Sequence, residues 1–253
     1  MTKKNTVIYN ITTEEEINTH CDYILRKFGS NTKEVEIIDI RNLLPCDARK
    51  ECRVVKLPDH ILNSKVTSLS RSACANIKAN EIILPQFITT IGADAFYGST
   101  IKRIVFPQSL NSLNGGALTG CKKLESITFT DGWIYIHHRW NDKYSKIERT
   151  YEDLFSYSDV TNIREIEVLG NHVSEALSLV ILSYDITFPQ NGINIYPKYL
   201  KPLTIDQLNF FLSQYQKAEA VEKIVMVMQE INNRKLASLP EKFRTQQSTI
   251  ELL

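Results

Sequence analysis

The side chains that could perform chemistry are few, and they do not cluster along this sequence of 253 residues. None of the five cysteines forms a CxxC pair or lies near histidines at the spacing of a zinc site: Cys21, Cys46, Cys52, Cys74 and Cys121. The sequence contains no GxSxG, HExxH or phosphate-binding glycine loop, and Gly115-Gly116 fits a structural turn better. We therefore expect no cofactor, no metal site and no enzymatic activity.

His137 and His138 are adjacent, and both belong to a segment that reads as extended. Neighbouring side chains of a strand point to opposite faces, so these two imidazoles cannot readily bind one metal ion. Cys74 and Cys121 are expected to be small core residues. A disulfide between Cys46 and Cys52 stays open as an alternative to free thiols.

The composition limits the classes of partner. The sequence has 30 Lys and Arg residues and 29 Asp and Glu residues, for a net charge of +1. This balance gives no net attraction for the phosphate backbone of a nucleic acid, so we expect no nucleic-acid partner. No apolar run approaches the roughly 20 residues of a membrane span, and residues 1–16 lack the apolar core of a signal peptide. We expect a cytoplasmic protein without membrane insertion. The alternative is a cell-surface or secreted protein whose signal lies upstream of this sequence.

One pattern occurs twice between Glu81 and Thr130, with Pro85 aligned on Pro107. The alignment also pairs Ile82 with Ile104, Leu84 with Phe106, Ile91 with Leu113, Ala95 with Ala117 and Phe96 with Leu118. A period in the twenties with one short strand per unit is typical of a leucine-rich solenoid. Residues 53–80 fit a degenerate copy, because Ala73 precedes Pro85 by the spacing that separates Ala95 from Pro107.

The pattern resembles the BspA type of leucine-rich repeat. The first unit matches at Ile91, Gly92, Ala95, Phe96, Gly98, Ile101, Ile104, Phe106 and Pro107. The second matches at Ala117, Leu118, Gly120, Cys121, Leu124, Ile127 and Phe129, but has Asn114 and Thr130 where the family has Gly and Pro. The resemblance implies an α/β repeat fold with a curved, mostly parallel sheet. It also implies a role in binding proteins or surfaces, without a catalytic constellation.

Alternation along each strand predicts which residues are displayed. In Arg103–Phe106, Ile104 and Phe106 should face the interior, and Arg103 and Val105 should face outward. In register, the displayed positions are Lys56, Ile83, Val105, Thr128, Glu167 and Thr187, flanked by Val54, Glu81, Arg103, Ser126, Glu165 and Asp185. Ile83 and Val105 would form an apolar spot with a charged rim, as a protein-binding surface requires.

The solenoid is expected over residues 34–200, with helical caps at 1–33 and 201–253. Capping boxes at Thr13–Glu16 and Thr204–Gln207 predict a helix over residues 14–28 and another from 204. A further helix should end at Asn232-Asn233, with one apolar face made of Val221, Ile224, Val225, Met228 and Ile231. The repeat pattern is expected to resume near Ala176, and residues 193–197 to add a last strand.

An aromatic-rich segment at 131–162 interrupts the repeats. It contains Trp133, Tyr135, His138 and Trp140, which are either binding anchors or side chains that seal a break in the solenoid. The sequence favours a non-enzymatic protein–protein interaction module whose partner is another protein. The alternatives are an exported adhesin or host-binding protein and, more remotely, an enzyme with its site in this segment. Neither the partner nor the oligomeric state follows from the sequence.

Overall fold

The computed structural model describes residues 6–28, 32–40, 52–132, 134–137 and 160–238. The chain divides into two compact units, Met1–Asn194 and Ile195–Leu253. The first unit contains two sheets and the second contains helices, and we describe each by itself. The alternative of a Cys46–Cys52 disulfide concerns Cys46, which lies outside the described residues.

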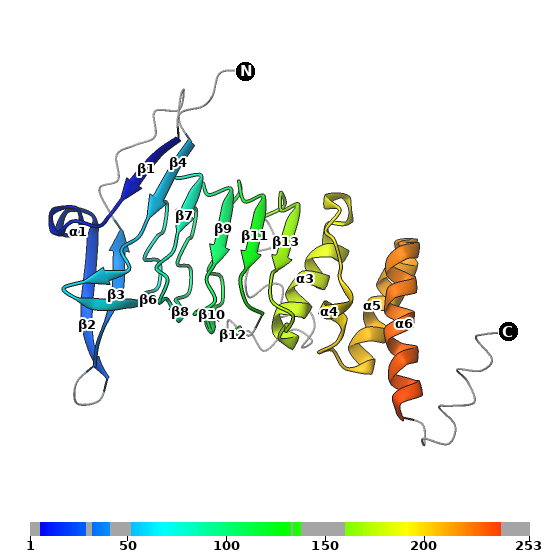
Figure 1. Cartoon of the computed structure of the whole chain (residues 1–253). Coiled ribbons are helices and arrows are strands. Elements are labelled where there is room, and N and C mark those ends of the chain that lie inside the picture. The colour runs from blue at the N-terminus through cyan, green and yellow to red at the C-terminus, as the bar shows by residue number, and fades with distance from the viewer. Residues whose placement is uncertain (1–5, 29–31, 41–51, 133, 138–159, 239–253) are drawn as a thin grey trace. The chain divides into compact units, whose positions relative to one another are not determined.

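Six parallel strands form the first sheet, here sheet A, in the order β1-β4-β7-β9-β11-β13 (Figure 1). They are β1 (Thr6–Asn10), β4 (Cys52–Lys56), β7 (Glu81–Ile83), β9 (Arg103–Phe106), β11 (Ser126–Phe129) and β13 (Glu165–Val168). The strands stand in chain order, so each repeat adds its strand beside the previous one.

The second sheet, here sheet B, has the order β12-β10-β8-β6-β3-β2, with β5 (His60–Ile61) paired to β6. Its other strands are β2 (Cys21–Phe28), β3 (Thr32–Ile40), β6 (Ser64–Leu69), β8 (Thr90–Ile91), β10 (Ser112–Asn114) and β12 (Tyr135–His137). Only the β2–β3 and β5–β6 pairs are antiparallel among the described strands. The chain thus alternates between the sheets, for example from β9 to β10 and then to β11.

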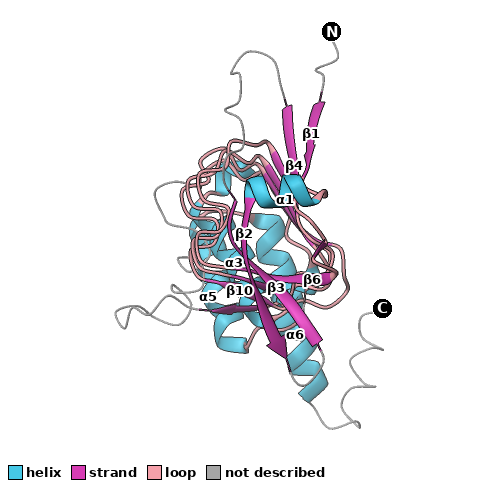
Figure 2. Ribbon diagram, turned by 90° about the vertical axis from the view of Figure 1, so that its left-hand side faces the viewer, coloured by secondary structure: helices cyan, strands magenta, loops and turns pink. Residues whose placement is uncertain are grey.

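Hydrogen bonds also join successive repeats in the turns between the sheets. The amide of Cys74 donates to the carbonyl of Ala95 at 2.7 Å, and that of Phe96 donates to Ala117 at 2.9 Å. Viewed along the stack, these connecting loops follow nearly the same path from one repeat to the next (Figure 2). The backbone groups of a turn are therefore satisfied by the neighbouring repeat, as those of a strand are.

Two positions of each turn have left-handed backbone. Asn76, Gly98 and Gly120 have φ of 59°, 64° and 74°. The second set is Ser72, Asp94 and Gly116, with φ of 59°, 56° and 72°. Gly98 and Gly120 are the glycines of the repeat pattern, and glycine accepts this conformation without strain. The degenerate repeat at 53–80 has the same geometry with Ser72 and Asn76.

The interior follows the predicted alternation. Along β9, Ile104 and Phe106 are buried and Arg103 and Val105 are exposed. Phe106 stacks on Phe129 of the next repeat, with ring centroids 4.9 Å apart. Alanine recurs at the equivalent position of three successive repeats. Ala73, Ala95 and Ala117 are fully buried, so a larger side chain at any of these positions would meet its neighbours.

The predicted helix over residues 14–28 is wrong in its second half. The capping box of Thr13 and Glu16 is present, but α1 (Glu14–His20) stops at His20. The chain continues as β2, which pairs with β3 along its whole length. Tyr23 and Ile24 suit a strand, and the hydrogen bonds to β3 outweigh the helical spacing of the apolar residues. The segment 1–33 is thus mostly strand where it is described, and β1 belongs to sheet A.

The pattern does not resume near Ala176 as predicted. Residues Glu175–Thr187 form helix α3, whose N-cap Ser174 accepts a hydrogen bond from the amide of Leu177 at 3.2 Å. The spacing from Ala176 to Pro189 matched a repeat by coincidence, whereas a capped apolar run of this length favours a helix. The strand predicted at 193–197 is also absent: a short 3-10 helix, η1 (Pro189–Asn191), precedes an irregular segment with Ile193 and Ile195 buried.

The second unit contains α4 (Pro197–Leu200), α5 (Ile205–Lys217) and α6 (Val221–Ser238). The predicted capping box of α5 is confirmed, since Thr204 accepts from the amide of Gln207 at 3.2 Å and Gln207 accepts from that of Thr204 at 2.7 Å. Helix α6 continues past Asn232-Asn233 to Ser238, and it buries Val227 and Ile231 rather than Val225 and Met228.

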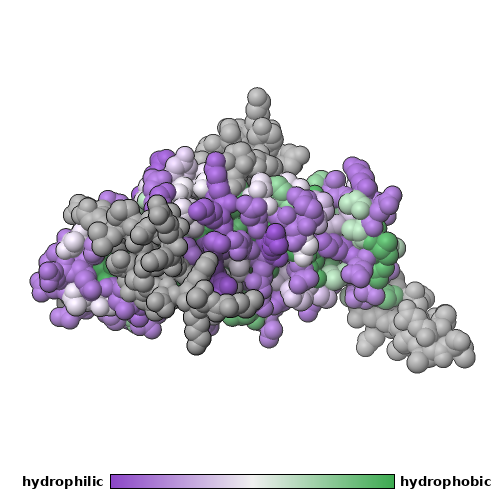
Figure 3. Space-filling view, turned by 90° about the horizontal axis from the view of Figure 1, so that it is seen from above, coloured by the Kyte–Doolittle hydropathy of each residue, from purple (hydrophilic) through white to green (hydrophobic). Residues whose placement is uncertain are grey.

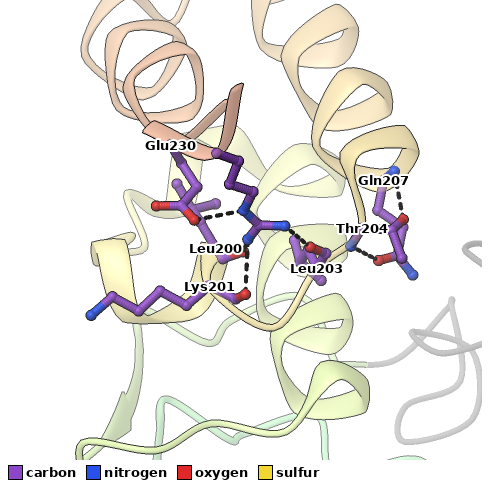
Figure 4. A network of polar contacts seen from close by, with 7 residues as sticks. Leu200, Lys201, Leu203, Thr204, Gln207 and Glu230 are labelled. Atoms are coloured by element: carbon purple, nitrogen blue, oxygen red, sulfur yellow. Dashed lines mark hydrogen bonds and ion pairs between the residues drawn. The ribbon is translucent and has the colours of Figure 1, made fainter. Parts of the chain in front are cut away.

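Arg234 explains why α6 extends beyond its expected end (Figure 4). Its guanidinium donates to Glu230 at 2.8 Å, to the carbonyls of Leu200 and Lys201 at 2.9 and 2.8 Å, and to that of Leu203. These carbonyls lie at the end of α4 and in the turn to α5, where helical hydrogen bonds end; that of Leu200 also accepts from the amide of Leu203 at 3.2 Å. One side chain of α6 therefore fixes the α4–α5 connection.

We expect Phe96→Ala or Leu124→Ala to lower the free energy of unfolding by about 2–5 kcal/mol, because both side chains are fully buried in the stacked repeats. Lys122→Ala, on the exposed side of the same turn, should change it by less than about 0.5 kcal/mol. Urea unfolding followed by circular dichroism measures both. Equal tolerance of the two classes would contradict the repeat register.

Arg234→Ala should destabilise the helices of the second unit by about 1–3 kcal/mol, because it removes the guanidinium that donates to Glu230 and to the carbonyls of the α4–α5 connection. Arg234→Lys should recover little, since an ammonium lacks the planar fork of donors. The measurement is urea unfolding followed by far-ultraviolet circular dichroism, with exposed Lys235→Ala as the control. An unchanged midpoint for Arg234→Ala would show that the network does not contribute to stability.

Candidate functional site

The outer face of sheet A carries the predicted row of displayed side chains in register. Lys56 pairs with Ile83, Ile83 with Val105, Val105 with Thr128, and Thr128 with Glu167. We call these five residues the central row. It extends at one end to Asn10 of β1, which pairs with Lys56 and which the sequence did not reveal. The repeat of β1 is too degenerate to be found by spacing.

A second row runs beside the central row through Val54, Glu81, Arg103, Ser126 and Glu165. Val54 is 7% exposed and adds little surface, but the other four are partly or fully exposed. Ser126 donates a hydrogen bond to Glu165 at 3.0 Å. This row provides the charged rim that the sequence predicted.

Ile83 and Val105 form the apolar centre of this face. They are 38% and 39% exposed, whereas their strand neighbours Ile82 and Ile104 are buried. Two adjacent aliphatic side chains among Glu81, Arg103 and Thr128 expose a small apolar area that a partner could cover. This face therefore combines a small apolar area with charged and polar neighbours.

A shallow hollow of about 180 Å³ lies where β7, β9 and β11 begin, lined by Asn80, Glu81, Lys102, Arg103, Glu125 and Ser126. Lys102 and Glu125 form an ion pair at 3.2 Å across two repeats. Seen from above, from the side where these strands begin, hydrophilic side chains cover most of the described repeats (Figure 3). Any ligand of this end of the sheet meets charges of both signs.

Thr187 and its flanking residue Asp185 are not part of this surface. Both belong to α3, so their assignment to displayed strand positions is wrong. The assignment extrapolated the repeat period into a segment whose apolar run and N-cap form a helix. Sheet A ends at β13 within the described residues.

The aromatic segment is described only in part. Tyr135 is 64% exposed on β12, opposite Ser112, and so lies on sheet B rather than beside the central row. Trp133, His138 and Trp140 lie outside the described residues. Of the predicted aromatic anchors, Tyr135 is therefore the one whose exposure the structure shows.

The sequence did not single out a polar groove on the outer face of sheet B. This hollow of about 340 Å³ is lined by residues that include Arg26, Glu34, Glu36, Thr67, Ser70, Thr89 and Asn114. Thr67 donates to Glu34 at 2.8 Å, and Glu36 accepts from Ser70 and pairs with Arg26. The available signal was a Thr or Ser every 22 residues, because Ser68, Thr90 and Ser112 are register partners.

The described thiols are not positioned for nucleophilic chemistry. Cys74 and Cys121 are fully buried, as predicted. Burial raises the pKa of the Cys74 thiol far above its ordinary value, and it raises the pKa of Cys121 to about 11 although Ser99 lies within hydrogen-bond distance. Cys121 donates to the carbonyl of Phe96 at 3.1 Å. Both thiols are thus protonated core groups at neutral pH.

Among the described residues, no three His, Cys, Asp or Glu side chains converge on a point where a metal ion could bind. None of the described helices has the length and apolar character that a membrane span requires.

Comparison with known proteins agrees with the repeats seen in the fold. Residues 50–150 match the sequence model of the family described as BspA type leucine-rich repeat region, in six copies. No curated protein and no solved structure matches this chain. The resemblance drawn from the repeated pattern is therefore confirmed, and parallel sheets with helices make this an α/β repeat fold.

The buried thiol of Cys121 predicts a pH dependence. In the unfolded chain it loses its proton near its ordinary pKa of 9.0, whereas the folded protein holds the proton to about 11. The folded state then binds more protons in this window, so the free energy of unfolding should fall as the pH rises from 9.0 towards about 11. Cys121→Ala should show a shallower fall in urea unfolding at several pH values. Equal slopes for the two proteins would contradict a buried, protonated thiol.

Proposed function

We propose that this chain, whose residues 50–150 carry BspA-type leucine-rich repeats, is a non-enzymatic module that binds another protein through the outer face of sheet A. The repeats support a role in protein interaction or adhesion. The assignment of binding to sheet A is a further step, and it rests on the side chains that the strands of this sheet expose.

The exposed pair of Ile83 and Val105 carries this proposal. In protein interfaces, a few central apolar or aromatic anchors supply most of the binding energy, and a polar rim excludes water around them. Ile83 and Val105 are neighbours in the central row, with Lys56 on one side and Thr128 and Glu167 on the other. The face has the required arrangement of an apolar centre and a charged border.

The charges of the border favour a protein over a nucleic acid. Glu81, Glu165 and Glu167 stand on this face with Lys56 and Arg103, so carboxylates would repel a phosphate backbone where the cations attract it. A protein surface with an apolar projection and charges of both signs would complement it. Among the described residues of this face, no three His, Cys, Asp or Glu side chains are grouped so that they could bind a metal ion.

The repeats of the first unit favour a curved solenoid in which sheets A and B are two of its sides. Helical caps of such a stack cover apolar edges that would otherwise meet water. Helix α3 supports this role at one end, because Ser174 donates to the carbonyl of Ile134, just before β12, at 2.9 Å. We propose that the rigid stack presents the central row as one continuous surface.

The test is capture of partners from a native lysate of the source organism, with quantification by mass spectrometry. Ile83→Asp should weaken binding of a captured partner by roughly thirtyfold or more in affinity, as expected for an anchor worth about 2 kcal/mol. Ile38→Asp is the matched control, because Ile38 of β3 is the same residue type with 39% exposure against 38% for Ile83.

Partners lost by Ile83→Asp and kept by Ile38→Asp would support the proposal. A captured protein exposed on a cell surface would favour adhesion as the form of binding. Partners kept by both variants would overturn the assignment to sheet A. Trp140→Ala would then test the aromatic segment directly.

A further inference from the structure

The two edge strands of sheet B differ in what lies beside them. At one end, the amide of Ser174 donates to the carbonyl of Gly132 at 2.8 Å, and α3 begins there beside β12. At the other end stands β2, which within the described residues pairs with β3 alone (Figure 1). An eight-residue edge strand without proline presents a row of backbone donors and acceptors to a further strand.

Natural edge strands are protected by charged side chains, prolines, bulges or short length. β2 carries Asp22, Arg26 and Lys27, and its register with β3 shifts at Asp22/Tyr23, but the centre of the strand is apolar. Here Ile24 and Leu25 in the middle of the strand are 39% and 42% exposed. Two adjacent exposed aliphatic residues at an open edge leave apolar area that a further strand would bury.

The two faces of β2 follow from its register with β3. Ile24 and Arg26 pair with Glu36 and Glu34, so they lie on the outer face of sheet B. Tyr23 and Leu25 pair with Ile37 and Val35, which are buried, so they lie on the inner face. Alternation places Asp22 on the outer face with Ile24.

The sequence of β2 is complementary to itself when two copies run antiparallel about Ile24. In that register the two Ile24 side chains are opposite each other, and Asp22 of each copy is opposite Arg26 of the other. On the inner face Tyr23 is opposite Leu25. Opposite charges and aromatic–aliphatic pairs are the favourable cross-strand combinations. Moving the centre to Leu25 would instead place Ile24 opposite Arg26 and Tyr23 opposite Lys27.

We propose that β2 is a self-association site, at which two copies of this chain join their B sheets into one continuous antiparallel sheet with Ile24 on the two-fold axis. Arg26 already pairs with Glu36 of its own chain, and its side chain is 54% exposed. It would therefore bridge Glu36 and Asp22 of the second copy. The inner face has room for this contact, because Tyr23 lines a hollow of about 400 Å³ with Ile17 and Ile61. The site is separate from the central row of sheet A.

The experiment is sedimentation velocity of the complete chain over a range of concentrations. We expect a monomer–dimer equilibrium for the wild type at concentrations up to on the order of 100 µM. Ile24→Lys should weaken it at least about tenfold, because it places like charges opposite each other on the axis. Ile38→Lys, at an equally exposed isoleucine of β3, should leave it unchanged.

A charge exchange identifies the register. Asp22→Lys alone sets the introduced lysine against Arg26 of the other copy, and Arg26→Asp alone sets the introduced carboxylate against Asp22. Each variant should therefore be mainly monomeric. Mixed together, the two variants should associate, because both facing pairs of the mixed dimer are then of opposite charge.

The mixed pairing follows from the two-fold axis. In the heterodimer, one facing pair joins the introduced lysine to the introduced aspartate, and the other joins the native Asp22 to the native Arg26. Both pairs are of opposite charge, whereas each homodimer holds two like-charged pairs. Melting temperatures of the single variants control for damage to the β2–β3 hairpin.

Cysteine cross-linking tests the geometry independently. Ile24→Cys should form an intermolecular disulfide under mild oxidation, since directly opposite Cβ atoms lie about 4.5–5.5 Å apart and a small shift brings them to the roughly 3.5–4.5 Å of a disulfide. Ile38→Cys should not. A wild type that stays monomeric throughout would overturn the proposal. So would a dimer unaffected by Ile24→Lys, or variants that fail to associate on mixing, because the association would then not use β2 in this register.

Discussion

The structure of the first unit depends on hydrogen bonds between backbone groups of successive repeats, in the strands and equally in the turns. The pairs Ile82–Ile104 and Ile104–Ile127 belong to this ladder, and so do the bonds from Cys74 to Ala95 and from Phe96 to Ala117. Such a ladder requires nearly the same path from every repeat. It therefore fixes the left-handed turn positions, the small residues at close contacts and the spacing of the inward side chains.

Gly92 is a position at which the close contact between successive repeats leaves no space for a side chain. A Cβ there would lie 2.6 Å from the backbone of Ser70 and Arg71, so no side chain fits without a shift. The equivalent position one repeat later is Asn114, which pairs with His137 of β12 and whose side-chain amide donates to the carbonyl of Ile91 at 2.9 Å. The departure from the family pattern at Asn114 thus adds a hydrogen bond to the preceding repeat.

The sequence predicted what the repeat period controls and failed where the period ends. The register of Lys56, Ile83, Val105, Thr128 and Glu167 was correct because every one of these residues lies on the ladder. The two capping boxes were correct because they are local hydrogen-bond patterns. Cys21–Phe28 and Glu175–Thr187 were wrong because pairing with β3 in one case and a capped apolar run in the other decided the structure. The choice of buried face on α6 depends on tertiary packing, which the helical period alone does not reveal.

The junction between β12 and β13 shows that the ladder tolerates unequal spacing. Ser126 pairs with Arg103 and also with Glu165, although 39 residues separate it from Glu165 in the sequence and only 23 from Arg103. The long connection at this point leaves the neighbouring strands β11 and β13 in register. Evolution, or a protein engineer, can therefore lengthen the segment here without disturbing the stacked repeats. A single residue added within β9 or β11 would instead move every following side chain of that strand to the opposite face of the sheet.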